Sequence, residues 1–255
     1  MFKLKCMAFP TRGSVYERKA SYSIAVTTPD EDGFRVGFEW CREQLKDGDS
    51  ITIWTPQRNN LGNSRLLEDL VLHKGIFHVT GRDGASIKKN GSVLMAWADP
   101  IDIAALAEFN NHRIDALCIA PRYKECLGLW VSEAKPNFLG GTSAWDWPLV
   151  ELHPVVVDEM KSLTRAINHN NTIASGDEKD RVVATLLALH DAGYELDGFL
   201  LATWTAAHGW CGNDPKKLKE YAEKINSGKR PRTQWTNCPG YVEELRSRRS
   251  EQPNN

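Results

Sequence analysis

A polar loop at residues 57–64 follows a short apolar stretch and carries groups that bind anions. The Arg58 guanidinium can pair with a phosphate or a carboxylate, and amide side chains can hydrogen-bond to the edges of a ligand. Asn63 or Ser64 is placed to cap a following helix, whose N-terminus also favours negative charge. The residues of this loop that we predict to bind a ligand are Gln57, Arg58, Asn59, Asn60 and Ser64.

Charged residues also follow other stretches that are predicted to be strands. Arg82, Asp99 and Arg122 each come shortly after such a stretch, and we add them to the predicted ligand-binding residues. In a parallel sheet these loops meet at one edge, where several arginines suit a phosphorylated or nucleotide-like ligand. The sequence contains neither GxGxxG nor the P-loop pattern GxxxxGK[ST]. The alternative is a set of solvated turns, in which Asp99 serves as a helix cap.

Lys and Arg outnumber Asp and Glu from Thr205 to the end of the sequence. Two predicted helices, residues 196–208 and 215–227, have the outline of a helix-turn-helix, but their connection is longer than the motif's usual ~3–4 residues. The basic side chains could contact phosphates, and Trp235 could stack on a base. A helix that also carries acidic residues can equally be an ordinary solvated one. The residues that we predict to contact nucleic acid are Lys216, Lys217, Lys219, Lys229, Arg230 and Arg232.

Other kinds of site find little support in the sequence. A structural zinc ion needs four ligands, usually as two close pairs, whereas His208 and Cys211 form the single close pair, so we predict no metal site and no cofactor. Neither GxSxG nor HExxH occurs. The acidic residues at 177–180 suit the first turn of a helix, where the helix dipole favours negative charge. No catalytic constellation is recognised.

The composition is that of an ordinary soluble globular protein, with 41% hydrophobic and 25% charged residues among 255. No apolar run reaches the ~18 residues of a membrane span, so no membrane association is expected. The N-terminus lacks the apolar core of a signal peptide, which predicts a cytoplasmic protein. A net charge of -1 argues against bulk electrostatic attachment to nucleic acid or membranes. Cys41 and Cys118 fall on apolar positions and are predicted to be buried thiols.

Strands and helices alternate in the first part of the sequence. Alternation of this kind predicts an α/β fold, a Rossmann-like and mostly parallel sheet of about five strands over residues 1–150. Residues 151–255 are predicted to form a small helical domain with a basic polar tail, and residues 121–154 an irregular segment. The predicted strands are residues 19–28, 50–55, 76–80, 92–97 and 115–120.

Three functions remain open on this sequence. The first is a non-catalytic binding or regulatory protein that recognises an anionic, nucleotide-like ligand or nucleic acid. The second is an enzyme acting on a nucleotide or nucleic acid, with Asp83 or Asp99 as a general acid/base or metal ligand beside Arg58. The third is a structural or protein-interaction subunit with a protein partner, for which the nine tryptophans are one indication.

Overall fold

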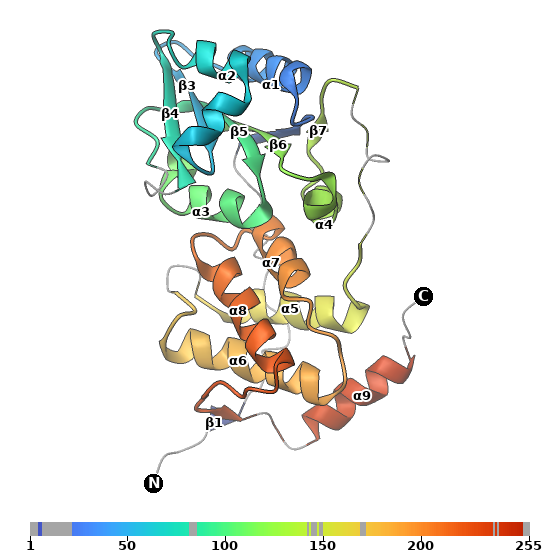
Figure 1. Ribbon diagram of the computed structural model, residues 1–255. Helices are drawn as coiled ribbons and strands as arrows, with labels where there is room; N and C mark the ends of the chain where they lie inside the picture. The colour runs from blue at the N-terminus through green and yellow to red at the C-terminus, as the bar shows by residue number, and fades with distance from the viewer. Residues whose placement is uncertain are drawn as a thin grey trace. The chain divides into compact units, whose positions relative to one another are not determined.

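The computed structural model contains two compact units, residues 19–150 (the α/β unit) and residues 151–255 together with strand β1 (the helical unit) (Figure 1). Strand β1 (Lys5–Cys6) pairs in parallel with β8 (Trp235–Thr236). The structure describes residues 5–6, 22–81, 86–141, 143, 147, 150–168, 172–236, 238 and 240–251, with the backbone alone at 5–6 and 108–111.

Six parallel strands form the sheet of the α/β unit, in the order β4-β3-β5-β6-β2-β7. The predicted α/β fold is therefore confirmed, with six strands in place of about five. β3 is buried along its whole length, as its β-branched and aromatic composition favours. The strands are β2 (Ser23–Val26), β3 (Ser50–Thr55), β4 (Ile76–Thr80), β5 (Gly91–Ala98), β6 (Ile114–Pro121) and β7 (Asn137–Phe138).

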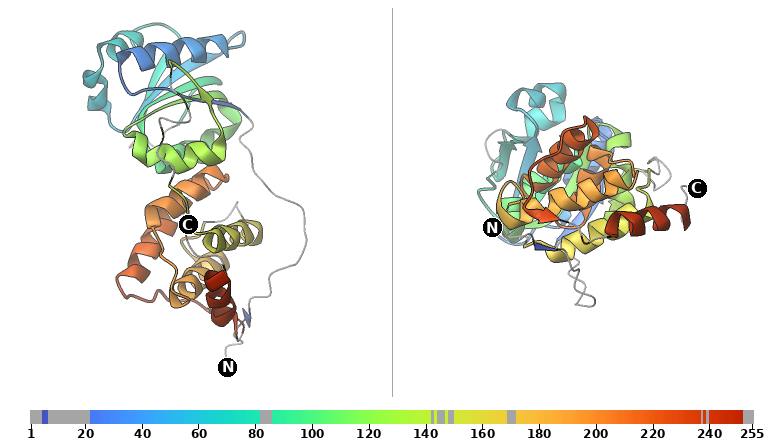
Figure 2. Two further views of the ribbon diagram at one scale, coloured as in Figure 1. Left: turned by 90° about the vertical axis from the view of Figure 1, so that its right-hand side faces the viewer. Right: turned by 90° about the horizontal axis from the view of Figure 1, so that it is seen from below.

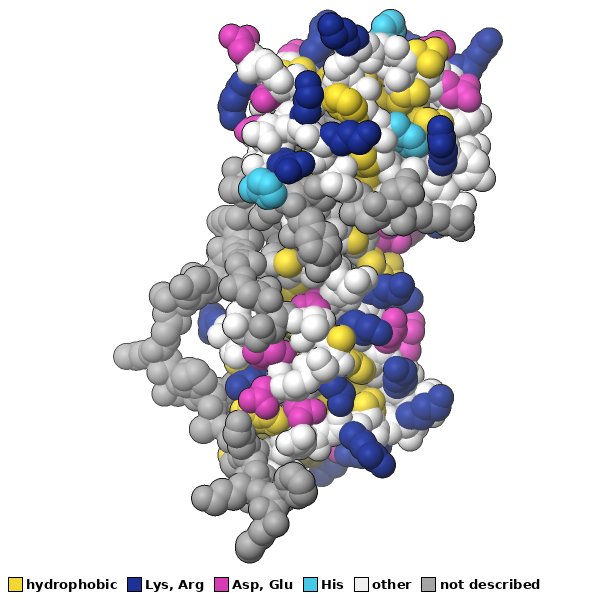
Figure 3. All heavy atoms as spheres, turned by 90° about the vertical axis from the view of Figure 1, so that its left-hand side faces the viewer, with side chains coloured by type: hydrophobic (Ala, Val, Ile, Leu, Met, Phe, Trp, Pro, Cys, Tyr) yellow, Lys and Arg dark blue, Asp and Glu magenta, His cyan; other side chains and the backbone are white. Residues whose placement is uncertain are grey.

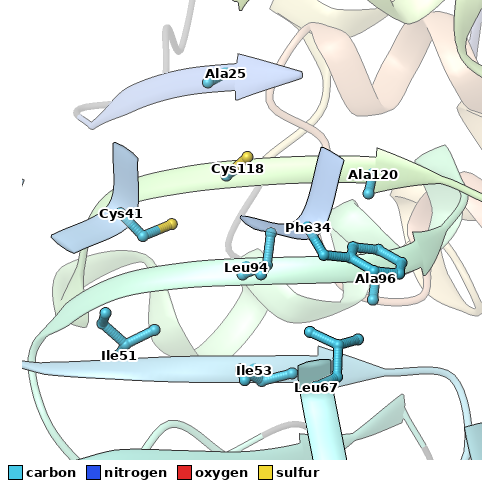
Figure 4. Close-up of a cluster of buried hydrophobic side chains, with 10 residues drawn as sticks. All are labelled: Ala25, Phe34, Cys41, Ile51, Ile53, Leu67, Leu94, Ala96, Cys118 and Ala120. Carbon is cyan, nitrogen blue, oxygen red and sulfur yellow. The ribbon is translucent and has the colours of Figure 1, made fainter. Parts of the chain in front are cut away.

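Helices cover both faces of this sheet (Figure 2). On one face α1 packs against α2, and their apolar side chains meet those of β3, β5 and β6 in the cluster of Figure 4. The predicted buried thiols of Cys41 and Cys118 both lie in this cluster and are free. The helices are α1 (Glu31–Glu43), the 3-10 helix η1 (Arg58–Asn63), α2 (Arg65–Leu70), α3 (Pro100–Asn110), the 3-10 helix η3 (Asn111–Arg113) and α4 (Lys124–Ala134).

The prediction of an irregular segment after residue 120 is wrong in part, because α4 and β7 lie there. The ends of α4 lack the usual sequence signals. Tyr123 occupies the N-cap without a side-chain hydrogen bond, and Lys135, not glycine, takes the left-handed conformation at the C-cap with φ 49°. β7 has only two residues, too few for a hydrophobic pattern.

The helical unit contains α5 to α9. α7 packs on α8, and α6 contacts both α8 and α9. Ser175 occupies the N-cap of α6 without a side-chain hydrogen bond, and Asp177 and Glu178 lie in the first turn. Within the part of the chain that the structure describes, no helix combines the length and the hydrophobicity needed to cross a bilayer. The bounds are α5 (Pro154–Ala166), α6 (Gly176–Asp191), α7 (Gly198–Ala207), α8 (Asp214–Asn226) and α9 (Tyr241–Glu251).

A buried carboxylate fastens α9 to α5. Glu159 on α5 is 4% exposed, and its Oε1 accepts a hydrogen bond of 2.8 Å from Arg248 Nη1. Its other oxygen accepts a hydrogen bond from the Tyr241 hydroxyl. Both oxygens thus have partners, as a buried charge requires, and the two partners belong to α9.

Glycine is required at Gly33, in the first turn of α1. A Cβ atom there would lie 2.1 Å from the carbonyl oxygen of Thr28. Gly33→Ala should therefore lower the free energy of unfolding by about 2 kcal/mol in urea denaturation, although alanine favours helices. Gly62→Ala is the control, because its Cβ would come no closer than 3.6 Å to a neighbour. Equal losses in the two variants would contradict this account of the packing.

Removing one partner of the Glu159 carboxylate should destabilise the helical unit. Arg248→Met leaves that charge buried with the Tyr241 hydroxyl alone, and the expected loss is about 3 kcal/mol. Chemical unfolding followed by far-UV circular dichroism measures it. Arg165→Met, at an exposed position of α5, should change stability by less than about 0.5 kcal/mol. A loss of less than about 0.5 kcal/mol for Arg248→Met as well would mean that the Glu159–Arg248 pair does not stabilise the fold.

Candidate functional site

The carboxyl ends of β3 and β5 form a topological switch point of the sheet. The chain leaves β3 through α2 to reach β4 on one side, and leaves β5 through α3 to reach β6 on the other. In open α/β sheets ligands bind at such a point, because the two connections diverge there. Trp54 of β3 pairs with Met95 of β5, so Gln57 is level with the end of β5. The predicted loop at 57–64 therefore begins at the switch point.

Several side chains of this loop are used to hold its shape. Gln57 and Asn60 form a capping box on η1, in which Asn60 Oδ1 accepts from the Gln57 amide at 2.8 Å. Ser64 is 2% exposed, and its hydroxyl caps α2 by accepting from the Leu67 amide at 3.2 Å. This confirms Ser64 as a helix cap and leaves its hydroxyl little freedom to meet a ligand.

Arg58 and Asn59 remain available to a ligand. Both are exposed, and neither side chain makes a hydrogen bond or ion pair with any residue that the structure describes. They are carried on η1, whose capping box fixes the start of the loop. The loop thus presents a guanidinium and an amide from a defined backbone.

The ends of β5 and β6 bring two carboxyl groups and an arginine together. The Arg122 amide donates to the Ala98 carbonyl at 3.1 Å, which fixes Arg122 beside the first turn of α3. Asp99 caps α3, since its Oδ1 accepts from the amides of Ile101 and Asp102 at 2.9 and 3.0 Å. Asp102 Oδ2 in turn accepts from the Asp99 amide at 3.0 Å.

Asp102 has an unusual acidity in this arrangement. Its burial, and then the charge of Asp99, raise the pKa of the Asp102 carboxyl to about 7, while the Asp99 amide and the charge of Arg122 act in the opposite direction. A carboxyl that titrates near neutral pH can donate or accept a proton in catalysis.

The predicted ligand-binding residues thus have different outcomes. Those of the loop after β3, together with Asp99 and Arg122, follow strands at the same edge of the sheet. Arg82 and the acid/base candidate Asp83 lie outside the described residues. Sequence reasoning missed Asp102, whose spacing of three from Asp99 is a capping-box signal.

The basic residues of the C-terminal region divide into two groups. Arg230 makes two hydrogen bonds to Asp191, at 2.8 and 2.7 Å. Lys217 and Lys219 pair with Glu220 and Glu223 on α8, at 2.8 and 3.2 Å. The remaining three are exposed and form no ion pair with any residue that the structure describes: Lys216, Lys229 and Arg232. On the face seen in Figure 3, basic and acidic side chains occur together over the helical unit.

His208, of the close pair His208–Cys211, is the C-cap residue of α7. The His208 ring stacks on Trp204 with 3.6 Å between centroids, and its Nδ1 lies 2.8 Å from the Trp204 carbonyl oxygen. Among the described residues, no group of three or more His, Cys, Asp or Glu side chains is arranged to hold a metal ion.

The Asp102 carboxyl should give the α/β unit a pH-dependent stability. An aspartate in an unfolded chain has a pKa of ~3.9, whereas burial and Asp99 raise the folded pKa of Asp102 to about 7. Between these values the folded protein keeps a proton that the unfolded chain releases. Stability should therefore fall as the pH rises from ~4 to ~7, by at most about 1.4 kcal/mol per pH unit.

Asp102→Asn tests this expectation, because the amide oxygen can still accept from the Asp99 amide but does not titrate. The free energy of unfolding of the wild type, relative to the variant, should decrease between about pH 5 and about pH 7. Asp69→Asn, at an exposed position of α2, should leave the wild-type pH dependence intact. Parallel curves for wild type and Asp102→Asn would contradict the raised pKa.

Comparison with known proteins reaches the helical unit alone. Residues 152–246 match the model of a domain of unknown function (DUF1889), a stretch that begins just before α5 and ends within α9. No curated protein gives a significant match to the chain, and neither does any solved structure.

Proposed function

We propose that the α/β unit binds an anionic, nucleotide-like small molecule at the carboxyl ends of β3 and β5, and that the protein acts through this binding as a sensor or regulator. One observation carries the proposal: the exposed Arg58 side chain, without a partner among the described residues, stands at the switch point of a parallel sheet. Open α/β sheets generally bind their ligands at such a point.

The chemistry of the neighbouring groups supports a nucleotide-like ligand. Arg58 and Arg122 offer guanidinium groups, which bind phosphate through paired hydrogen bonds. Asn59 adds an amide that can donate or accept. Carboxylates such as Asp99 accept hydrogen bonds from sugar hydroxyls, as acidic residues do in many dinucleotide-binding sheets. The phosphate, the sugar and the polar edge of the base could therefore each form hydrogen bonds with one of these side chains.

A second candidate function is acid–base catalysis on such a ligand, and the raised pKa of Asp102 favours it. Asp102 replaces Asp99 as the favoured proton donor or acceptor, because Asp99 is used as the cap of α3. If a nucleotide is converted by the wild type and left intact by Asp102→Asn, this candidate is preferred over pure binding.

Nucleic-acid binding by the helical unit has weaker support. Three of the six predicted basic residues are paired with carboxylates, which reduces the charge that they offer to phosphates. A protein partner for this unit stays a prediction from the sequence. Short DNA and RNA therefore belong in the binding experiment as competing probes.

Arg58→Ala should abolish most of the affinity for a nucleotide. We expect ADP to raise the melting temperature of the wild type, since a ligand of the native state stabilises it by mass action. Loss of charged hydrogen bonds should weaken binding by about tenfold or more. Stability without ligand should change by less than about 0.5 kcal/mol, because the side chain is exposed.

The control is Lys74→Ala, which removes an exposed cation before β4, at the opposite edge of the sheet. It should leave ADP affinity unchanged. Undiminished binding by Arg58→Ala would exclude Arg58 from the site. A wild type that responds to DNA or RNA and to no small anion would overturn the proposal in favour of the helical unit.

A further inference from the structure

The end of β5 contains an irregularity beside the switch point. Ala96 pairs with Ala120 and Ala98 pairs with Pro121, so Trp97 is an extra residue that faces no partner on β6. This is a β-bulge, a feature that redirects a side chain and occurs often beside active sites. Trp97 lies two residues before Asp99 and level with the start of the loop that carries Arg58.

Trp97 has a backbone conformation that usually belongs to glycine. Its φ is 56°, in the left-handed region. Bulges with a left-handed residue normally place glycine there, because a side chain makes the conformation unfavourable. For a bulky residue it is a true outlier, and such conformations cluster at ligand-binding and catalytic sites. Tryptophan, which has the largest side chain, thus occupies a position where glycine would adopt the same φ without strain.

The bulge also changes the face of the sheet on which the indole lies. Leu94 and Ala96 point toward α1 and α2, so regular alternation would turn residue 97 to the other face. Instead the Trp97 ring packs edge-on against Phe34 of α1, with 5.0 Å between centroids and 81° between planes. Figure 4 shows Phe34 beside Ala96, near the carboxyl end of β5.

Trp97 is not enclosed by these contacts. Phe34 is 1% exposed, whereas the Trp97 residue is only partly buried. The contact with Phe34 positions the ring, and Trp97 stands near the carboxyl end of β5, at the edge of the sheet where the proposed ligand binds. A fixed, partly exposed aromatic ring is a stacking platform for a planar group.

We infer that Trp97 stacks on an aromatic ring of the ligand, so that the site selects a nucleotide over a phosphate compound without a base. This inference rests on the proposed function and deepens it by assigning the base to Trp97. Arg58 then binds the phosphates of the same ligand. A purely structural role predicts something different, since any apolar side chain of similar bulk would then serve.

The experiment compares two probes on three proteins by calorimetric titration. ADP carries a base and inorganic pyrophosphate does not, and the ratio of their Kd values isolates the contribution of the base. The wild type should bind ADP at least about tenfold more tightly than pyrophosphate. Trp97→Leu, which keeps apolar bulk, should bring the two affinities close together, and Trp97→Phe should preserve most of the difference.

Each outcome has one meaning. An unchanged pyrophosphate affinity in Trp97→Leu demonstrates a folded site, and a lost preference for ADP in the same variant supports stacking. A preference that survives in Trp97→Leu overturns the inference. A wild type that binds both probes equally also overturns it while the proposed anion site stands. A wild type that binds neither probe contradicts the proposed function itself.

Discussion

Parallel hydrogen bonding between all six strands is the constraint on which the α/β unit depends. Because every strand runs in the same direction, every loop that leaves a carboxyl end emerges at one edge of the sheet. Residues as far apart in sequence as Arg58 and Arg122 are thereby brought to a common edge. The divergence of the chain after β3 and β5 marks the position along that edge at which open α/β sheets bind ligands.

Much of this arrangement could be predicted from local sequence. The bounds of β3 and β4 were given by β-branched runs that end at Pro56 and Gly81, and the cap of α3 by the pair Asp99–Pro100. Helix α4 could not be predicted in the same way. Its C-cap is in the left-handed conformation, for which glycine is the usual sequence signal, but the residue there is Lys135. The sheet was thus foreseen better than the segment that follows it.

The site was less predictable than the fold. Residue type and position after a strand selected Arg58 as a candidate, and the same reasoning selected Ser64, whose hydroxyl caps α2. The acidity of Asp102 depends on burial and on a neighbouring charge, neither of which a single sequence displays. The conformation of Trp97 depends on strand register, which is decided by the pairing of β5 with β6.

The pairing of β1 with β8 has a consequence for how the chain folds. The strand at residues 5–6 is hydrogen-bonded to residues 235–236, while the whole α/β unit lies between them in sequence. On the ribosome the α/β unit emerges complete before β8 is synthesised. It can therefore fold before the pairing of β1 with β8 is possible. Closing so long a loop is slow, and a unit that has already folded within it shortens the flexible chain that must be closed. The helical unit is therefore expected to be the last part of the chain to assemble.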